Sequence, residues 1–192
     1  MRGIKPKIYI IPGMGESTRA RNYSELIKYA RNLGFRVMPV NIHWSTKMSM
    51  DDYVKQADLK IPNNIQNGYI LGFSFGAYVA SILSSKKNMK GYIFCSISPY
   101  FKENLKYIPK ETKKYFGKKL FNSFRKYSFP DDQTAQAWFL IGKKDWKIAI
   151  KVAKESYKKW LGKKSFYLIK EAGHNLAHPN YLKRVKYIIK ML

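Results

Sequence analysis

The stretch GYILGFSFG, residues 68–76, decides the interpretation of this chain. An apolar run of strand length leads directly into the pattern G-x-S-x-G, and residues 75–84 after it are small and apolar enough for a buried helix. In such a strand–turn–helix the serine occupies a tight bend with its hydroxyl above the sheet edge, and a side chain at Gly72 or Gly76 would press on neighbouring backbone. Ser74 is therefore a candidate nucleophile, and the motif indicates hydrolytic chemistry.

Around this stretch, apolar runs of strand length alternate with runs of helical period. Strands that alternate with helices indicate a parallel sheet covered by helices on both faces. We therefore expect a single α/β domain over 1–192, with an open, mostly parallel sheet of about six strands. The predicted strands are 7–11, 36–40, 68–71, 91–97, 137–141 and 165–169. The predicted helices are 17–33, 50–58, 75–84, 146–161 and a last one from Asn180.

Residues 99–136 interrupt this alternation. They connect two predicted parallel strands, a step for which about a dozen residues suffice when one helix makes the crossover. The interval is rich in lysine and in aromatic residues, and we expect two short helices that form a small cap or lid. Two interpretations stay open: aromatic rings packed on the body beneath a solvated lysine face, or a basic aromatic surface that docks an anionic membrane or nucleic acid.

The composition indicates a globular chain with a strong positive charge: 192 residues, 37 Lys+Arg against 12 Asp+Glu, and a net charge of +25. This charge attracts anions at low salt, but the lysines are scattered through every segment, which indicates weak anionic-surface binding rather than a specific nucleic-acid site. The only cysteine, Cys95, lies in an apolar run and is expected in the core. No apolar stretch approaches the roughly 20 residues of a membrane span, so we expect a cytoplasmic protein without a transmembrane segment.

A serine hydroxyl needs a base to take its proton and a third group to orient that base. Of the three histidines, His174 follows the last predicted strand, where it can reach over the sheet edge toward Ser74. His178 precedes Pro179 and is expected to begin the last helix. Asp145 lies in the loop after strand 137–141 and is the candidate acid. All three candidates then follow carboxyl ends of strands, where open parallel sheets place their sites.

An oxyanion formed at this serine would need two backbone N–H donors. One candidate is the amide of Phe75, and the other is the amide of Met14 in the loop PGMGE, residues 12–16, after the first strand. The same loop could begin a dinucleotide site, which requires a small residue at position 18 and an acid after the second strand. The chain has Thr18 and Asn41 there, and this disfavours the dinucleotide alternative.

With these motifs in this order, the chain resembles an α/β-hydrolase over nearly its whole length. It is similar to the small, nearly lidless branch that includes retinoblastoma-binding-protein-9-like serine hydrolases and small bacterial carboxylesterases. The resemblance implies Ser74 as nucleophile, His174 as general base and acid, and Asp145 as the group that orients the histidine. It also implies the Met14 and Phe75 amides as the oxyanion hole.

The chain departs from that family pattern in several places. Pro12 and Gly13 stand where the family usually has histidine and glycine before the oxyanion loop. Compared with the full fold, we expect a sheet without the first two strands, and the interval 99–136 is longer and more basic than a minimal member needs. Glu103 is an alternative to Asp145, because some members carry the acid after the preceding strand.

Two functions of different class follow from these observations. The first is a serine hydrolase that cleaves small carboxylic esters or thioesters through an acyl-enzyme intermediate. The second is a catalytically weak or inactive binding module that docks an anionic membrane or nucleic acid through the basic interval 99–136. Three histidines and one cysteine are too few to suggest a cluster of metal ligands, so we expect neither a metal nor a cofactor.

Overall fold

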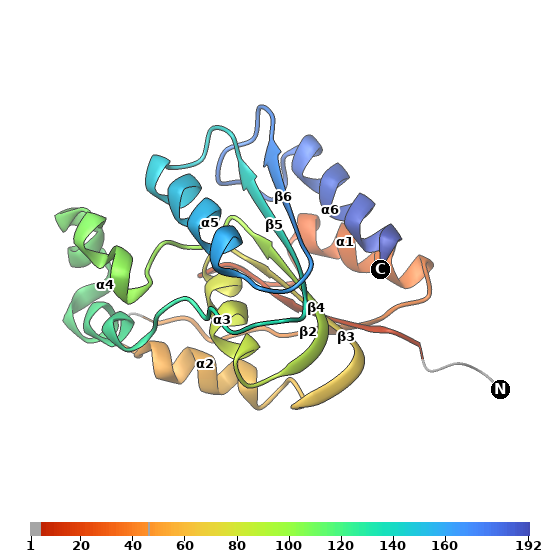
Figure 1. Cartoon of the computed structure of the whole chain (residues 1–192), viewed down its shortest axis with the longest axis horizontal. Coiled ribbons are helices and arrows are strands. Elements are labelled where there is room, and N and C mark those ends of the chain that lie inside the picture. Colours follow the sequence, from red (N-terminus) through yellow and green to blue (C-terminus); the bar gives the residue numbers. More distant parts are fainter. Residues whose placement is uncertain (1–4, 46) are drawn as a thin grey trace.

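The computed structural model describes residues 5–45 and 47–192 and shows a sheet of six strands in the order β2-β1-β3-β4-β5-β6 (Figure 1). Every neighbouring pair of strands is parallel. The chain starts in the interior of the sheet, adds β2 at one edge and then proceeds strand by strand toward β6 at the other. The strands are β1 (Lys7–Ile11), β2 (Arg36–Pro39), β3 (Asn64–Phe73), β4 (Asn88–Cys95), β5 (Gln136–Gly142) and β6 (Lys164–Ile169).

Helices cover both faces of this sheet, which confirms the predicted fold class (Figure 1). Side chains alternate along each strand between the two cores: Ile8 and Ile10 lie in one, Tyr9 and Ile11 in the other. Strands buried on both faces appear in the sequence as the continuous apolar runs described above. One face carries α1 (Arg21–Asn32) and α6 (Pro179–Met191); the other carries α2 (Met50–Asp58), α3 (Phe75–Ser84) and α5 (Lys147–Lys159).

The largest difference from the predicted elements concerns β3, which begins at Asn64 instead of residue 68. Asn64 and Ile65 pair with the start of β4 before the register shifts ahead of Tyr69. Three of the four residues in this extension are polar and exposed, and only Ile65 packs on the core, so the extension gives little hydrophobic signal. The next strand, β4, ends at Cys95 because Ser96 turns the chain with a φ of 45°.

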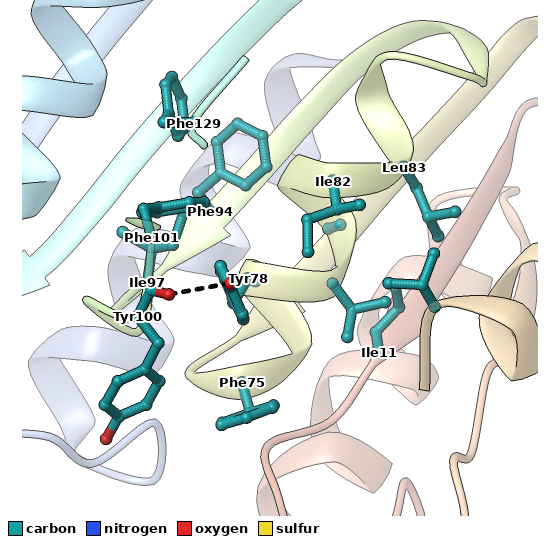
Figure 2. Close-up of a cluster of buried hydrophobic side chains, with 14 of the residues drawn as sticks. Ile11, Phe75, Tyr78, Ile82, Leu83, Phe94, Ile97, Tyr100, Phe101 and Phe129 are labelled. Atoms are coloured by element: carbon teal, nitrogen blue, oxygen red, sulfur yellow. Dashed lines mark hydrogen bonds between the residues drawn. The ribbon is translucent and has the colours of Figure 1, made fainter. Parts of the chain in front are cut away.

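Helix α3 is buried along all ten of its residues, as its apolar composition predicted. It packs against β3 and β4, and its Tyr78 meets the first residues of the interval after β4 (Figure 2). The hydroxyl of Tyr78 donates to the carbonyl of Tyr100 at 3.0 Å, and its ring meets that of Phe101 edge-on at 4.7 Å between centroids. The start of the long interval is therefore fixed to the helix that follows the G-x-S-x-G turn.

The interval between β4 and β5 contains a 3-10 helix η1 (Lys102–Tyr107), helix α4 (Lys110–Ser123) and a short η2 (Phe124–Lys126). Gly117, with a φ of 71°, divides α4 into two short helical pieces. Phe116 and Phe124 are buried, whereas Tyr115 is 69% exposed. We call the segment 99–135 the cap; most of its rings pack inward and its lysines face solvent, as the first of the two interpretations proposed.

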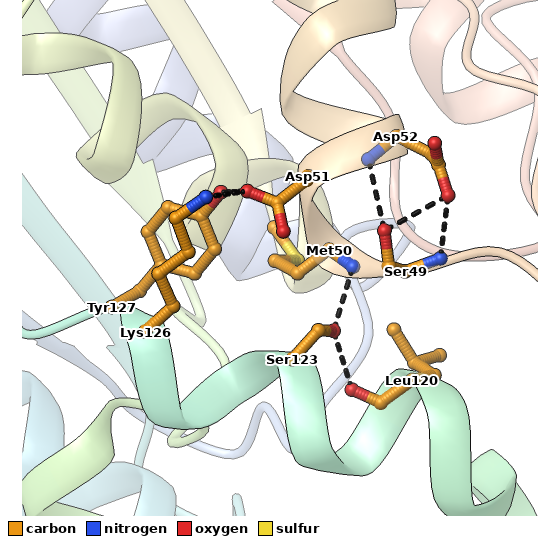
Figure 3. A network of polar contacts seen from close by, with 8 residues as sticks. All are labelled: Ser49, Met50, Asp51, Asp52, Leu120, Ser123, Lys126 and Tyr127. Atoms are coloured by element: carbon orange, nitrogen blue, oxygen red, sulfur yellow. Dashed lines mark hydrogen bonds and ion pairs between the residues drawn. The ribbon is translucent and has the colours of Figure 1, made fainter.

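Polar contacts fasten the cap to the first turn of α2 (Figure 3). The Ser123 hydroxyl accepts a hydrogen bond from the Met50 amide at 2.7 Å, so it supplies a partner for an N–H that the helix leaves unpaired. Lys126 and the hydroxyl of Tyr127 both bind the carboxylate of Asp51 at 2.5 Å. In the described ranges 5–45 and 47–192, no helix is both long and apolar enough to span a bilayer.

Candidate active site

Ser74 lies on the bend between β3 and α3 with a φ of 54° and a ψ of −119°, a conformation that is unfavourable for any residue except glycine. The neighbouring glycines make this bend sterically feasible. A Cβ at Gly72 would lie 2.6 Å from the Cα of Ala77, and one at Gly76 would collide with the carbonyl oxygens of residues 11–12. The strained turn places the serine at the N-terminus of α3, whose dipole favours negative charge.

The structure brings Ser74, His174 and Asp145 together in a chain of hydrogen bonds. The His174 Nε2 atom lies 2.7 Å from the Ser74 Oγ, and its Nδ1 lies 3.0 and 3.1 Å from the two carboxylate oxygens of Asp145. The Asp145 side chain is fully buried and also accepts a hydrogen bond from the Trp146 amide at 2.8 Å. Ser74 and His174 are partly exposed, so a reactant can reach the serine while the acid stays away from solvent.

Close packing of the loops after β5 and β6 places the acid beside the histidine. A Cβ at Gly142, the last residue of β5, would collide with the carbonyl oxygen of Ala172. The Lys144 amide donates to that same carbonyl at 2.8 Å. The two loops therefore lie against each other, and Asp145 and His174 project from adjacent points at the carboxyl end of the sheet.

The loop after β1 forms a tight turn in which the Glu16 amide donates to the Gly13 carbonyl at 3.0 Å. Gly15 has a φ of 76°, as the third position of a type II turn requires. No acceptor in the described part of the chain pairs with the Met14 amide, and the amide of Phe75 begins a helix, where it has no intrahelical partner. This loop packs against the first turn of α3, so both predicted oxyanion donors belong to neighbouring backbone.

A carboxylate and a phenol, neither of them predicted from the sequence, brace the same loop. The Gly13 amide lies 2.9 Å from Glu16 Oε2 and 3.1 Å from the Tyr23 hydroxyl, which itself donates to that carboxylate. Tyr23 is fully buried; burial first, and then the charge of Glu16, raise the pKa of its phenol. The sequence offered one signal for Glu16, which is an acidic residue in a chain with few of them. Nothing in the sequence indicates that residue 23 lies in contact with residue 16.

A second serine, also missed from the sequence, lies beside the first. The Ser98 Oγ is 3.4 Å from the Ser74 Oγ, and the Ser98 amide donates to the Ser74 carbonyl at 3.3 Å. Ser98 is only 2% exposed and follows β4, the strand next to β3 in the sheet. Its place after the neighbouring strand is the signal that could have identified it.

The alternative acid, Glu103, has different partners. Its carboxylate accepts from the Phe129 amide at 3.3 Å and pairs with Lys159 at 3.1 Å. Burial acts to raise the pKa of Glu103, but hydrogen bonds with its own backbone, with Lys159 and with Phe129 outweigh burial and lower the pKa below the ordinary value. Glu103 therefore fastens the cap to α5, and the acid that contacts His174 is Asp145.

Three further predictions concern single side chains. His178 is the N-cap of α6 and accepts from the Asn180 amide at 3.3 Å, which confirms that it begins the last helix. Cys95 is fully buried, as predicted, and burial raises the pKa of its thiol. Thr18 and Asn41, the two residues that disfavoured a dinucleotide site, contact each other: the amide and the hydroxyl of Thr18 both donate to Asn41 Oδ1 at 3.0 Å. Within the residues that the structure describes, no three His, Cys, Asp or Glu side chains gather as metal ligands would.

Comparison with known proteins places the fold. No protein-family model matches this sequence, and no curated protein matches it. Mouse alpha/beta hydrolase domain-containing protein 10 superposes with a TM-score of 0.82 at 12% identity, over 100% of this chain and 90% of that one. A putative hydrolase from Agrobacterium vitis S4 gives 0.79 at 14% identity, over 97% and 87%. Est1E from Butyrivibrio proteoclasticus gives 0.77 at 14%, over 97% and 86%. This chain therefore has the α/β-hydrolase fold.

Proposed function

We propose that this chain is a serine hydrolase that cleaves small carboxylic esters or thioesters through an acyl-enzyme intermediate on Ser74. One observation carries the proposal: the Ser74 Oγ lies 2.7 Å from His174 Nε2, and Asp145 holds the other nitrogen of the same ring at 3.0 Å. This is the relation of nucleophile, base and orienting acid that activates a serine hydroxyl.

The chemistry proceeds in two steps. The Ser74 oxygen attacks the acyl carbon while its proton passes to His174 Nε2. The developing oxyanion is bound by the Met14 and Phe75 amides, and the leaving alcohol or thiol takes the proton as the bond to the acyl carbon breaks. Water then attacks the acyl-serine ester, gives its proton to His174, and the proton returns to the serine as the acid departs.

The aromatic packing around Phe75 supports a short acyl group. Phe75 is buried, and the rings of Trp44, Tyr100 and Phe116 lie 5.6, 5.6 and 5.8 Å from it between centroids. These rings occupy the space beside the nucleophile on the cap side. Phe73 lines the opposite side, since its ring contacts His174 at 5.2 Å. A long acyl chain would have to displace several buried rings, whereas an acetyl or propionyl group would not.

The test is covalent labelling with a fluorophosphonate probe, followed by intact mass measurement. We expect one adduct on the wild type and none on Ser74→Ala, because only an activated serine attacks the probe. The matched control is Ser98→Ala, which removes the neighbouring hydroxyl 3.4 Å away and should keep the adduct. In steady state, Ser74→Ala should lower kcat for p-nitrophenyl acetate by at least about 10⁴-fold.

The outcomes separate the two candidate functions. Turnover that falls from acetate to butyrate to octanoate esters would support the short acyl pocket. A folded wild-type protein that forms no adduct would contradict the hydrolase proposal. Salt-sensitive retention of such an inert protein on anionic vesicles would then favour the binding module, whose basic cap also exposes Tyr107 and Tyr115.

A further inference from the structure

The side chain of Trp146 forms a contact that neither the triad nor the fold requires. Its indole stacks on the imidazole of His174 with 4.9 Å between ring centroids and only 3° between the ring planes. The residue is 54% exposed, so it contributes little to the hydrophobic core. An exposed tryptophan laid flat on the proposed base therefore calls for a role at the site.

The hydrogen bonds of His174 restrain its ring in some directions only. Contacts of Nδ1 with Asp145 and of Nε2 with Ser74 lie along the edge of the imidazole, so they set the position of the ring within its own plane. They resist a tilt out of that plane far less. The flat indole opposes such a tilt, and the Phe73 ring, 5.2 Å away at an angle of 45°, touches the imidazole as well.

The stack also matches the charge that develops during acyl transfer. The imidazole becomes positively charged once it has taken the serine proton, and the electron-rich face of tryptophan attracts a cation. The indole further shields one face of the Asp145–His174 pair from water, which strengthens that interaction. Each of these effects acts on the chemical step and not on the binding of substrate.

We propose that Trp146 is a positioning residue that holds the His174 ring from its face and favours its charged form during catalysis; this rests on the proposed hydrolase function. The position of Trp146 in the chain supports the assignment. Its backbone amide binds the Asp145 carboxylate at 2.8 Å, and its carbonyl accepts from Ile150 in the first turn of α5. The residue is thereby fixed at both ends of its backbone, so its side chain is presented to His174 from a rigid point.

Replacement of the side chain gives a clean test because the backbone bond to Asp145 remains in every variant. We expect Trp146→Ala to lower kcat for p-nitrophenyl acetate about tenfold with KM nearly unchanged, and to slow fluorophosphonate labelling in parallel. Trp146→Phe, which keeps a stacking ring, should restore most of the rate. The matched control is Tyr187→Ala, a similarly exposed aromatic on α6 at 48%, which should leave both rates unchanged.

A second readout needs no activity. The ring current of a stacked indole shifts the imidazole proton resonances of His174 upfield, and His174→Asn identifies those resonances among the three histidines. They should move downfield in Trp146→Ala and stay in place in Tyr187→Ala. Unchanged resonances, or an unchanged kcat with a KM that rises only for aryl esters, would overturn the proposal; the latter would make Trp146 a substrate platform. An inert wild type would overturn the hydrolase function and the catalytic role together, whereas the resonances would still show whether the stack exists.

Discussion

The two sides of the candidate site are held together in different ways. On the triad side, which comprises the turns that carry Ser74, Asp145 and His174, backbone touches backbone, and a single added methyl at Gly76 or Gly142 would collide with carbonyl oxygens. On the cap side, which comprises residues 99–135 and the rings beside Phe75, the contacts are between tilted or edge-on aromatic rings and between a few polar side chains. The backbone packing on the triad side has no room for added atoms, whereas the side-chain packing on the cap side can accommodate substitutions that change its shape slightly.

This difference follows from what each side has to achieve. Proton transfer requires donor and acceptor atoms within about 3 Å in a fixed orientation, and a small misplacement costs a large factor in rate. Enclosing an acyl group requires only shape and apolar surface, which many combinations of rings can supply. We therefore expect substitutions on the triad side to act on rate or on folding as a whole, and those on the cap side to act by increments.

The largest contrast should come from the two acids that the sequence offered. Asp145→Asn keeps the shape of the side chain but removes the charge that orients His174, so kcat should fall by about 10³- to 10⁴-fold. Glu103→Gln should change kcat less than about twofold, because Glu103 joins the cap to Lys159 and lies outside the triad. Steady-state hydrolysis of p-nitrophenyl acetate measures both. If both variants lost kcat to the same extent, the proposed distinction between the triad side and the cap side would be wrong.

The next contrast concerns stability. Gly76→Ala forces a methyl group against the carbonyls at the end of β1 and should lower the free energy of unfolding by about 3 kcal/mol. Ser123→Ala on the cap side leaves the Met50 amide without its partner and should lower it by about 1 kcal/mol. Urea denaturation followed by circular dichroism compares the two. A smaller loss for the glycine variant would mean that the turn between β3 and α3 relaxes at little cost.

The same comparison explains what the sequence could predict. The turn that carries Ser74, the parallel strands and the loops that carry Asp145 and His174 follow from local rules: glycines where backbone must approach closely, and strands that end where polar residues begin. These rules identified the candidate residues that the structure brings close to one another, and they also predicted most element boundaries. Predictions from local pattern fail at the mostly polar start of β3, where backbone pairing begins at Asn64 and Ile65 is the one apolar residue before Tyr69.

Contacts that depend on three-dimensional packing were beyond the sequence. The bracing of Gly13 by Tyr23, and the stack of Trp146 on His174, join residues whose separation in the chain gives no hint of proximity. The aromatic cap showed its composition but not its arrangement: Phe116 packs inward while its neighbour Tyr115 faces solvent. Gly117 interrupts α4 directly after these two residues, so the helical period of the sequence does not indicate which of them is buried.

The smallest expected effect is a pH dependence on the cap side, at Asp51. Partial burial acts to raise the pKa of this carboxyl, but the hydrogen bonds from Lys126 and Tyr127 outweigh it, so the pKa in the folded state lies below its ordinary value of 3.8. Folding therefore favours the charged form. The stability that the charged Asp51 contributes is fully present when the pH lies above its ordinary pKa, and it is lost as the pH falls through the lower pKa of the folded state. Because the Asp51 side chain is 44% exposed, solvent screening keeps the contribution below about 1 kcal/mol.

Urea unfolding of the wild type and of Asp51→Asn between pH 7 and about pH 3 isolates this contribution, since all other carboxyl groups are common to both proteins. The wild type should be more stable by a constant amount down to about pH 5, and the difference should shrink below about pH 4. A difference for Asp51→Asn that persists unchanged at the lowest pH would show that the side chain acts through its shape, and the cap would then be fastened to α2 by packing and by Ser123 instead of by charge.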